Sequence, residues 1–183
     1  MLARFFSACS LALWLISSAP SSADSLSAVC DHRLDDEIKA SVHDFGREYP
    51  DWLDWKAQIY QESRYDSDVV SPVGAAGVCQ VMPATWRDWE KKNGWVGLNP
   101  HIAKYCLIGG QQMMASNRRF FSPAPFPDRQ YLAQGGYNAG PGNVRKALGL
   151  GGAPAWATVV ANLPKVTGKH SAETITYVAR IKQ

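Results

Sequence analysis

The sequence has little excess charge, few histidines and no long apolar run beyond its N-terminal segment. Its 19 Lys and Arg stand against 16 Asp and Glu, which is too even a balance to favour binding to nucleic acid. The four histidines do not cluster with the four cysteines, so neither a metal site nor a cofactor is expected. No strand pattern, internal repeat or second domain is recognisable, and no later segment is suited to crossing a membrane.

The N-terminus has the pattern of a signal peptide. Arg4 supplies a positive charge, residues 8–16 form a short apolar core, and residues 21–23 are small, as at a cleavage site. We therefore expect residues 1–23 to be a signal peptide and residues 24–183 to be a periplasmic or secreted domain. An uncleaved membrane anchor is the alternative. Removal of Arg4 leaves 18 basic against 16 acidic residues, a net charge of +2.

Apolar residues recur at helical spacing along most of the remaining chain, which predicts a mainly α fold. Asp51 is expected to cap one helix, Pro83 to begin another and Asp128 to cap a third. Gly109 and Gly110 fall inside a predicted helix, where such residues are tolerated when helices pack closely. The expected helical segments are 34–49, 51–63, 128–138, 143–148, 156–163 and 172–182, together with one that begins at Pro83 and includes Trp89 and one that begins at Pro100 and includes Met113. Residues 120–128 are expected to form a proline-rich loop.

Four short motifs follow one another along the chain. Glu62 and Ser63 end an apolar helical segment, and a glycine-rich stretch, Gly74-Ala75-Ala76-Gly77-Val78-Cys79-Gln80, comes next. Gly136-Tyr137-Asn138-Ala139-Gly140 and Ala172-Glu173-Thr174-Ile175-Thr176-Tyr177 complete the series. In this order the motifs resemble the catalytic domain of soluble-type (SLT-like) lytic transglycosylases, which are related to goose-type lysozyme. The resemblance implies a lysozyme-like single helical domain with a substrate cleft.

Glu62 is the candidate catalytic residue. Cleavage of a glycosidic bond needs a proton for the leaving oxygen, and a carboxylic acid supplies it near neutral pH when burial raises its pKa. The resemblance implies that Glu62 is the single acid and base. It would cleave the β-1,4 bond between N-acetylmuramic acid and N-acetylglucosamine and leave a 1,6-anhydromuramoyl end. Asp66 and Asp68 are the nearest candidates for a second carboxylate, but their polar loop favours a structural role.

The resemblance also implies substrate contacts by Ser63, Gln80, Tyr137, Asn138, Glu173 and Tyr177. Each residue has an ordinary structural alternative. Ser63 and Asn138 suit a helix end, Tyr137 suits a core, and Glu173 suits the first turn of a helix. Gln80 has an amide group that both donates and accepts, as recognition of sugar acetamido groups requires.

Cys30, Cys79 and Cys106 remain after the predicted cleavage. Cys79 and Cys106 stand where the resembled family usually has Met and Asn, and two coupled departures from its pattern favour a disulfide between them. Pairing of Cys30 with one of them, or three free thiols, are the alternatives.

Three other functions stay open at this stage: lysozyme-type hydrolysis of peptidoglycan, cleavage of chitin, and a catalytically silent cell-wall-binding scaffold of a secretion apparatus. The intact Glu62, Gln80 and Tyr137-Asn138 set favours an enzyme over a scaffold. The expected partners are peptidoglycan glycan strands, with secretion, conjugation or phage assembly proteins as candidates for localising the enzyme. Ordinary wall turnover is an equally suitable setting.

Overall fold

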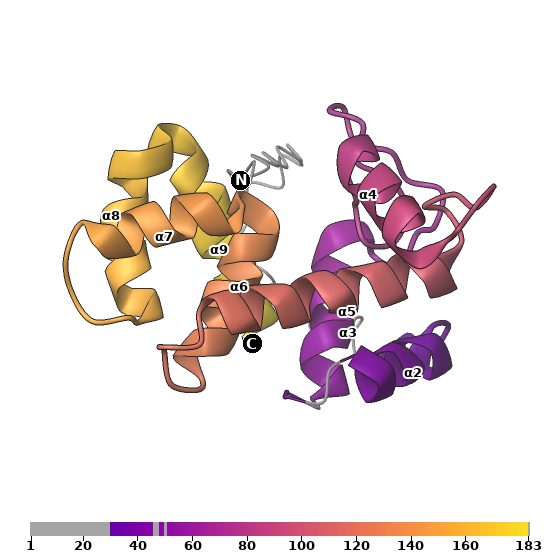
Figure 1. The fold of residues 1–183 in the computed structure, drawn as a ribbon, viewed down its shortest axis with the longest axis horizontal. Coiled ribbons are helices and arrows are strands. Elements are labelled where there is room, and N and C mark those ends of the chain that lie inside the picture. The colour runs from indigo at the N-terminus through magenta and orange to yellow at the C-terminus, as the bar shows by residue number, and fades with distance from the viewer. Residues whose placement is uncertain (1–29, 46–47, 50, 183) are drawn as a thin grey trace. The chain divides into compact units, whose positions relative to one another are not determined.

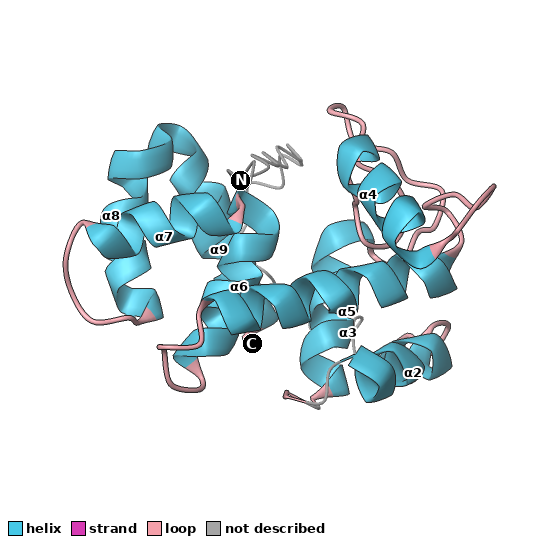
Figure 2. Cartoon of the chain, viewed as in Figure 1, coloured by secondary structure: helices cyan, strands magenta, loops and turns pink. Residues whose placement is uncertain are grey.

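The computed structural model describes residues 30–45, 48–49 and 51–182, so the predicted signal peptide lies outside the described residues. Helices joined by loops make up this part of the chain (Figures 1 and 2). Extended pairing within it is limited to isolated bridges that join Ala76 to Val70 and to Val81. The prediction of a mainly α fold is confirmed. No helix in these ranges is both long enough and apolar enough to cross a membrane.

The chain folds into two compact units. The described part of the first unit comprises residues 30–45, 48–49, 51–113 and 180–182, and that of the second unit comprises residues 114–179. The elements in chain order are α2 (Asp35–Phe45), α3 (Trp52–Ser63), α4 (Pro83–Asn93), α5 (Ala103–Phe120), α6 (Asp128–Ala139), α7 (Pro141–Gly149), α8 (Trp156–Thr167), the 3-10 helix η1 (Gly168–His170) and α9 (Ser171–Ile181).

Local sequence signals set the ends of α3 and α4. The Asp51 side chain caps α3 as predicted, accepting hydrogen bonds from the backbone N–H groups of Leu53 at 3.0 Å and Asp54 at 3.2 Å. Pro83 begins α4, where its missing N–H costs nothing. Gly94 ends α4 in the left-handed conformation, and its N–H donates to the Glu90 carbonyl.

The core of the first unit is formed by α2, α3, the loop that follows α3, and the first half of α5. Its buried side chains include Ile38, Trp55, Ile59, Val78 and Leu107. The close packing expected at Gly109 is present, because a Cβ atom there would lie 2.2 Å from Cε3 of Trp89. Gly109 therefore lets α5 lie directly against an indole ring of α4.

The second unit is built on α6, α7 and α8, which pack against one another. Its core includes Leu132, Val144, Val159 and Leu163.

The prediction for Asp128 was wrong in one respect. Asp128 does not cap α6, because it is the first residue of this helix. Pro127 occupies the cap position and makes no side-chain hydrogen bond there. Oδ1 of Asp128 instead accepts from the N–H of Trp156 at 2.7 Å, at the start of α8. A cap for a helix distant in sequence cannot be read from local spacing, which explains the error.

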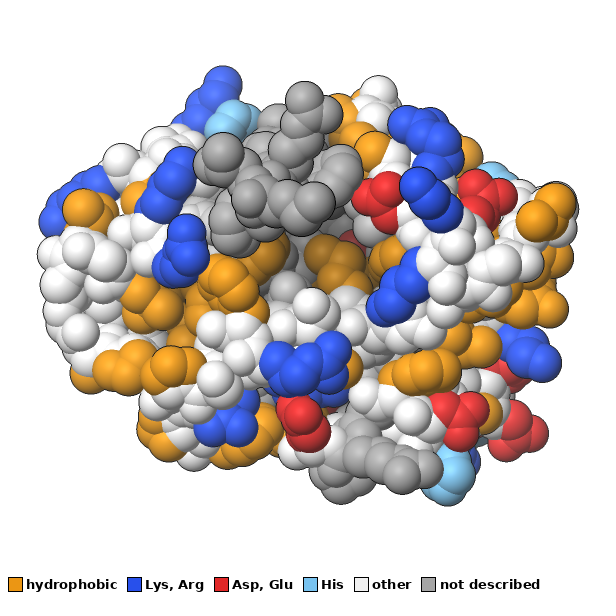
Figure 3. All heavy atoms as spheres, viewed as in Figure 1, with side chains coloured by type: hydrophobic (Ala, Val, Ile, Leu, Met, Phe, Trp, Pro, Cys, Tyr) orange, Lys and Arg blue, Asp and Glu red, His pale blue; other side chains and the backbone are white. Residues whose placement is uncertain are grey.

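The two units differ in charge. The second unit carries seven Lys and Arg against two Asp and Glu, whereas residues 30–113 and 180–183 carry 11 against 13. Figure 3 shows basic rather than acidic side chains on the visible face of α7 and α8, at the left of the view. The positive charge is therefore concentrated in the second unit, whose net charge is +5, whereas the first unit has a net charge of −2.

Candidate active site

Glu62 is the second-last residue of α3, and its side chain is half-buried. It lines a cavity of about 690 Å³ in the first unit, together with Tyr60, Ser63 and Tyr65. Its half-burial fits the place of Glu62 at the end of an apolar helical segment. Glu62 is thus partly shielded from solvent and still open to a space that can receive a ligand.

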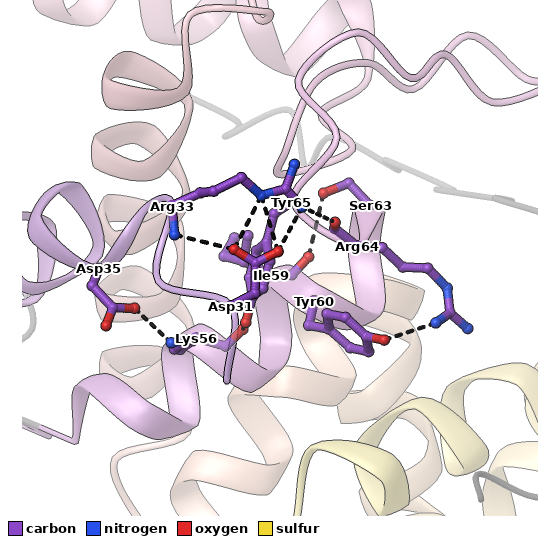
Figure 4. Close-up of polar contacts among 9 residues, drawn as sticks. All are labelled: Asp31, Arg33, Asp35, Lys56, Ile59, Tyr60, Ser63, Arg64 and Tyr65. Atoms are coloured by element: carbon purple, nitrogen blue, oxygen red, sulfur yellow. Dashed lines mark hydrogen bonds and ion pairs between the residues drawn. The ribbon is translucent and has the colours of Figure 1, made fainter. Parts of the chain in front are cut away.

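A strained turn ends α3 immediately after this carboxyl group. Arg64 and Tyr65 both adopt left-handed conformations, with φ of 54° and 63°, which are uncommon for residues other than glycine. The Arg64 N–H donates to the Tyr60 carbonyl at 2.9 Å, and its Nη1 donates to the Tyr60 hydroxyl at 2.8 Å (Figure 4). The buried Tyr65 hydroxyl donates to the Lys56 carbonyl at 3.2 Å. These bonds hold the turn that directly follows Glu62 and Ser63.

A buried ion pair joins α3 to α2. Nζ of Lys56, a residue that is 2% exposed, lies 2.6 Å from Oδ1 of Asp35 (Figure 4). Partial burial opposes ionisation of Asp35, but hydrogen bonds from Lys56 and His32 outweigh it and lower the pKa of this carboxyl. The pair therefore anchors the middle of the helix that carries Glu62.

Ser63, Asp66 and Asp68 follow or flank this turn in the same cavity. The Ser63 hydroxyl donates to the Ile59 carbonyl at 3.4 Å, which is the backbone contact expected at a helix end (Figure 4). Both aspartates are exposed, and Oδ1 of Asp66 accepts from the Asp68 N–H at 2.8 Å. The aspartates thus shape a turn, as their polar loop predicted.

Gln80 belongs to a tightly bonded loop of the first unit. It is 4% exposed and adopts a left-handed conformation with φ of 46°. Its Nε2 donates to the Gly77 carbonyl at 3.1 Å and to the Val69 carbonyl at 3.3 Å. Both hydrogens of the amide are therefore used inside the protein, and Oε1 is buried. This geometry favours a role in holding the loop over a direct contact through Nε2.

Gly77 brings the same loop against the segment that precedes α5. Its φ is 70°, and a Cβ atom at this position would lie 2.0 Å from the carbonyl oxygen of Pro100. Next along the chain, His101 Nδ1 lies 2.7 Å from the carbonyl oxygen of Ser67. Gly77 thus permits a close approach between two backbone segments of the protein itself.

Cys79 and Cys106 lie side by side in the core of the first unit. Both are free thiols, both are fully buried, and Cys79 makes a side-chain hydrogen bond with Cys106. Burial, this bond, and electrostatic repulsion of the thiolate form by Cys106 and Glu62 raise the pKa of the Cys79 thiol. Cys30 is an exposed free thiol. The structure therefore brings together the two cysteines that the sequence paired, as thiols rather than as a disulfide.

The other predicted substrate contacts lie in the second unit. Tyr137 and Tyr177 are buried, whereas Asn138 and Glu173 are half-buried. Burial raises the pKa of Glu173, and a side-chain hydrogen bond from Asn138 partly opposes this rise. Gly136, which precedes Tyr137, has little space, since a Cβ atom would lie 3.2 Å from Nδ2 of Asn117.

The structure thus divides the predicted residues into two sets. Glu62, Ser63 and Gln80 belong to the first unit, and Tyr137, Asn138, Glu173 and Tyr177 belong to the second. Sequence reasoning missed Lys56 and Thr174, which support members of these sets. Helical spacing was the signal that could have identified Thr174. It lies four residues before Val178 and seven before Ile181, so it shares the apolar face of the helix with them and is buried like them.

The chain is similar to known proteins in sequence and in structure. The family model of the transglycosylase SLT domain matches residues 55–155. Membrane-bound lytic murein transglycosylase F of Alteromonas mediterranea is 31% identical over 140 residues, which is 72% of this chain and 29% of that protein. The chain therefore spans less than a third of the length of this curated relative.

Solved structures show the same fold. The 70 kDa soluble lytic transglycosylase of Escherichia coli has a TM-score of 0.63 and 23% identity, covering 83% of this chain and 24% of that one. An inactive mutant of the lytic transglycosylase Slt of Pseudomonas aeruginosa has a TM-score of 0.62 and 24% identity, with the same coverage. These neighbours confirm the lysozyme-like fold class expected from the sequence.

Proposed function

Because this chain belongs to the transglycosylase SLT domain family, we propose that it is a lytic transglycosylase that cleaves the glycan strands of peptidoglycan. The observation that carries the proposal is the placement of Glu62. It is a half-buried carboxyl group at the end of α3, beside a cavity, inside the segment that the family model matches. The naming of the Alteromonas mediterranea relative as a lytic murein transglycosylase supports the same activity.

In the proposed mechanism Glu62 acts first as an acid and then as a base. Its carboxylic acid gives a proton to the oxygen that bridges N-acetylmuramic acid and N-acetylglucosamine, and the bond from this oxygen to the anomeric carbon breaks. The acetamido group of the substrate stabilises the positive charge on that carbon. The Glu62 carboxylate then takes the proton of the muramoyl 6-hydroxyl, whose oxygen bonds to the anomeric carbon. Glu62 is protonated again, and no water is consumed.

This mechanism needs no second carboxylate near Glu62. Asp66 and Asp68 are exposed, and the Asp66 side chain accepts a backbone N–H of its own turn. We propose that Asn138, Glu173, Tyr137 and Tyr177 bind the glycan, as the family resemblance implies. We assign Gln80 mainly to maintenance of the loop, since its Nε2 is occupied by two carbonyl groups.

We further propose that the protein is exported by way of residues 1–23 and acts on the wall in the periplasm or outside the cell. A secretion, conjugation or phage assembly protein would then direct it to one place on the wall. Deletion of such a partner should abolish localised wall cutting while the purified enzyme stays active. Unchanged localisation without any partner would contradict this part of the proposal.

Digestion of purified peptidoglycan, followed by mass spectrometry of the muropeptides, tests the activity. We expect products lighter by one water than ordinary reducing muropeptides. Glu62→Gln should abolish them, because an amide can neither donate the proton nor take it back. Glu90→Gln, the same chemical change on α4, is the matched control and should leave the products unchanged. Reducing-end products would instead indicate a lysozyme-type hydrolase.

We also propose that Cys79 and Cys106 become a disulfide after export. In thiol–disulfide exchange, an incoming protein or small-molecule disulfide is reduced to two thiols while the two buried thiols lose two protons and two electrons. Alkylation of the unfolded, unreduced protein should then label Cys30 alone. Labelling of Cys79 and Cys106 in protein from the exported compartment would contradict the disulfide.

A further inference from the structure

Thr174 follows Glu173 on α9 and has no part in the function proposed above. It is 3% exposed, whereas Thr176 on the same helix is exposed. A buried hydroxyl group needs a hydrogen-bond partner, because leaving it without one costs free energy. The Thr174 hydroxyl donates to Oδ1 of Asn138 on α6 at a distance of 2.7 Å. This bond joins Thr174 to a residue expected to contact the glycan.

The two ends of the Asn138 amide have different partners within the second unit. Oδ1 accepts the bond from Thr174. Burial raises the pKa of Glu173, and a side-chain hydrogen bond between Asn138 and Glu173 partly opposes this rise, as expected when Nδ2 donates to a carboxylate. An amide oxygen and an ionised carboxylate can both only accept, so the two contacts together allow a single orientation of the amide.

We propose that Thr174 is a positioning residue for glycan binding. Its hydroxyl holds the Asn138 amide so that one Nδ2 hydrogen bonds Glu173 and the other is offered to the carbonyl oxygen of a sugar acetamido group. The inference rests on the proposed function, because it takes the ligand to be the glycan of peptidoglycan. Without the Thr174 hydroxyl, Oδ1 loses its partner and the amide is held through Nδ2 alone, so it can rotate away from the direction in which it offers its second Nδ2 hydrogen to the acetamido carbonyl.

Three variants separate the hydroxyl group from the shape of the side chain. Thr174→Val removes the hydroxyl and keeps the branched shape, whereas Thr174→Ser keeps the hydroxyl and removes the methyl group. Thr176→Val makes the same change as the first variant at an exposed position of the same helix. Thermal unfolding followed by circular dichroism shows which variants are folded, and Thr174→Ala is the second test of the hydroxyl if valine is not accommodated.

The measurements are kcat/KM on peptidoglycan and the Kd for glycan strands freed of their peptides. The Kd is measured in proteins that also carry Glu62→Gln, so that binding is read without cleavage. Loss of one hydrogen bond that orients a ligand contact should lower kcat/KM about three- to tenfold and raise Kd by a similar factor. Thr174→Ser and Thr176→Val should both stay close to the parent protein.

A double-mutant cycle shows whether Thr174 acts through Asn138. In an Asn138→Ala background, Thr174→Val should cause no further loss of binding, because the amide that it orients is gone. Equal losses with and without Asn138, equal losses for the Val and Ser variants, or no loss with Thr174→Val would each overturn the proposal. Failure of the proposed function would give a different result, because the parent protein itself would then form no cleavage products.

Discussion

Replacement of Gly77 by alanine tests how the loop before Gln80 is held. The change forces a side chain into a left-handed conformation with φ of 70°, which costs about 1–2 kcal/mol. It also places a methyl group 2.0 Å from the Pro100 carbonyl oxygen, where backbone must move, and overpacking of this kind costs about 1–3 kcal/mol. We therefore expect Gly77→Ala to lower the free energy of unfolding by about 2–5 kcal/mol.

Gly94 provides a matched control in the same unit. Its φ is also 70°, but a Cβ atom there would meet nothing within 4 Å. Gly94→Ala should therefore cost only the conformational part, about 1–2 kcal/mol. The difference between the two variants isolates the contact with Pro100.

Urea unfolding followed by tryptophan fluorescence measures both losses. Activity should separate the variants further, because the Gly77 carbonyl accepts from Nε2 of Gln80 and the Gly94 turn has no such contact. Gly77→Ala should reduce cleavage of peptidoglycan, and Gly94→Ala should leave it unchanged under conditions where both are folded. Equal destabilisation by the two substitutions would refute the steric argument.

Three further predictions concern residues that the fold explains. Gly109→Ala should destabilise the protein by about 1–3 kcal/mol in urea unfolding, because its methyl group would enter the Trp89 ring. Lys56→Met should cost about 1–3 kcal/mol near neutral pH, since the Asp35 carboxylate loses its buried partner. The lowered pKa of Asp35 stabilises the parent fully above the ordinary value of 3.8, and this stability is lost as the pH falls through the folded pKa. As the pH falls through this range, the free energy of unfolding should therefore decrease less in Lys56→Met than in the parent protein. Burial raises the pKa of Glu173, so the parent loses stability as the pH rises from 4.5 through the folded pKa. Glu173→Gln lacks this penalty, and its stability relative to the parent should be higher at about pH 7 than at about pH 4 in the same assay.

Features governed by neighbours in sequence were predictable. The Asp51 cap, the start of α4 at Pro83 and the turn at Asp66 each depend on residues within a few positions, and the structure contains all three. Gly109 was also interpretable, because a glycine inside a helix indicates close packing even when its partner is unknown.

Features governed by distant residues were not predictable. Asp128 caps a helix that begins 28 residues later, and Thr174 bonds a residue 36 positions earlier. For the candidate site, even a contact that is nearer in sequence was missed. Nε2 of Gln80 donates to the carbonyl groups of Val69 and Gly77, because the loop folds back on itself. The contact of this amide with sugar stays a prediction. Side-chain type predicts what a group can bind, and only the fold decides what it does bind.

We propose that Glu62 closes an anhydro ring without consuming water. Digestion of peptidoglycan in water labelled with heavy oxygen, with mass spectrometry of the new glycan ends, tests it most directly. The account predicts unlabelled ends that are lighter by one water, formed by the parent protein and not by Glu62→Gln. Incorporation of the label at new reducing ends would contradict the account and establish hydrolysis.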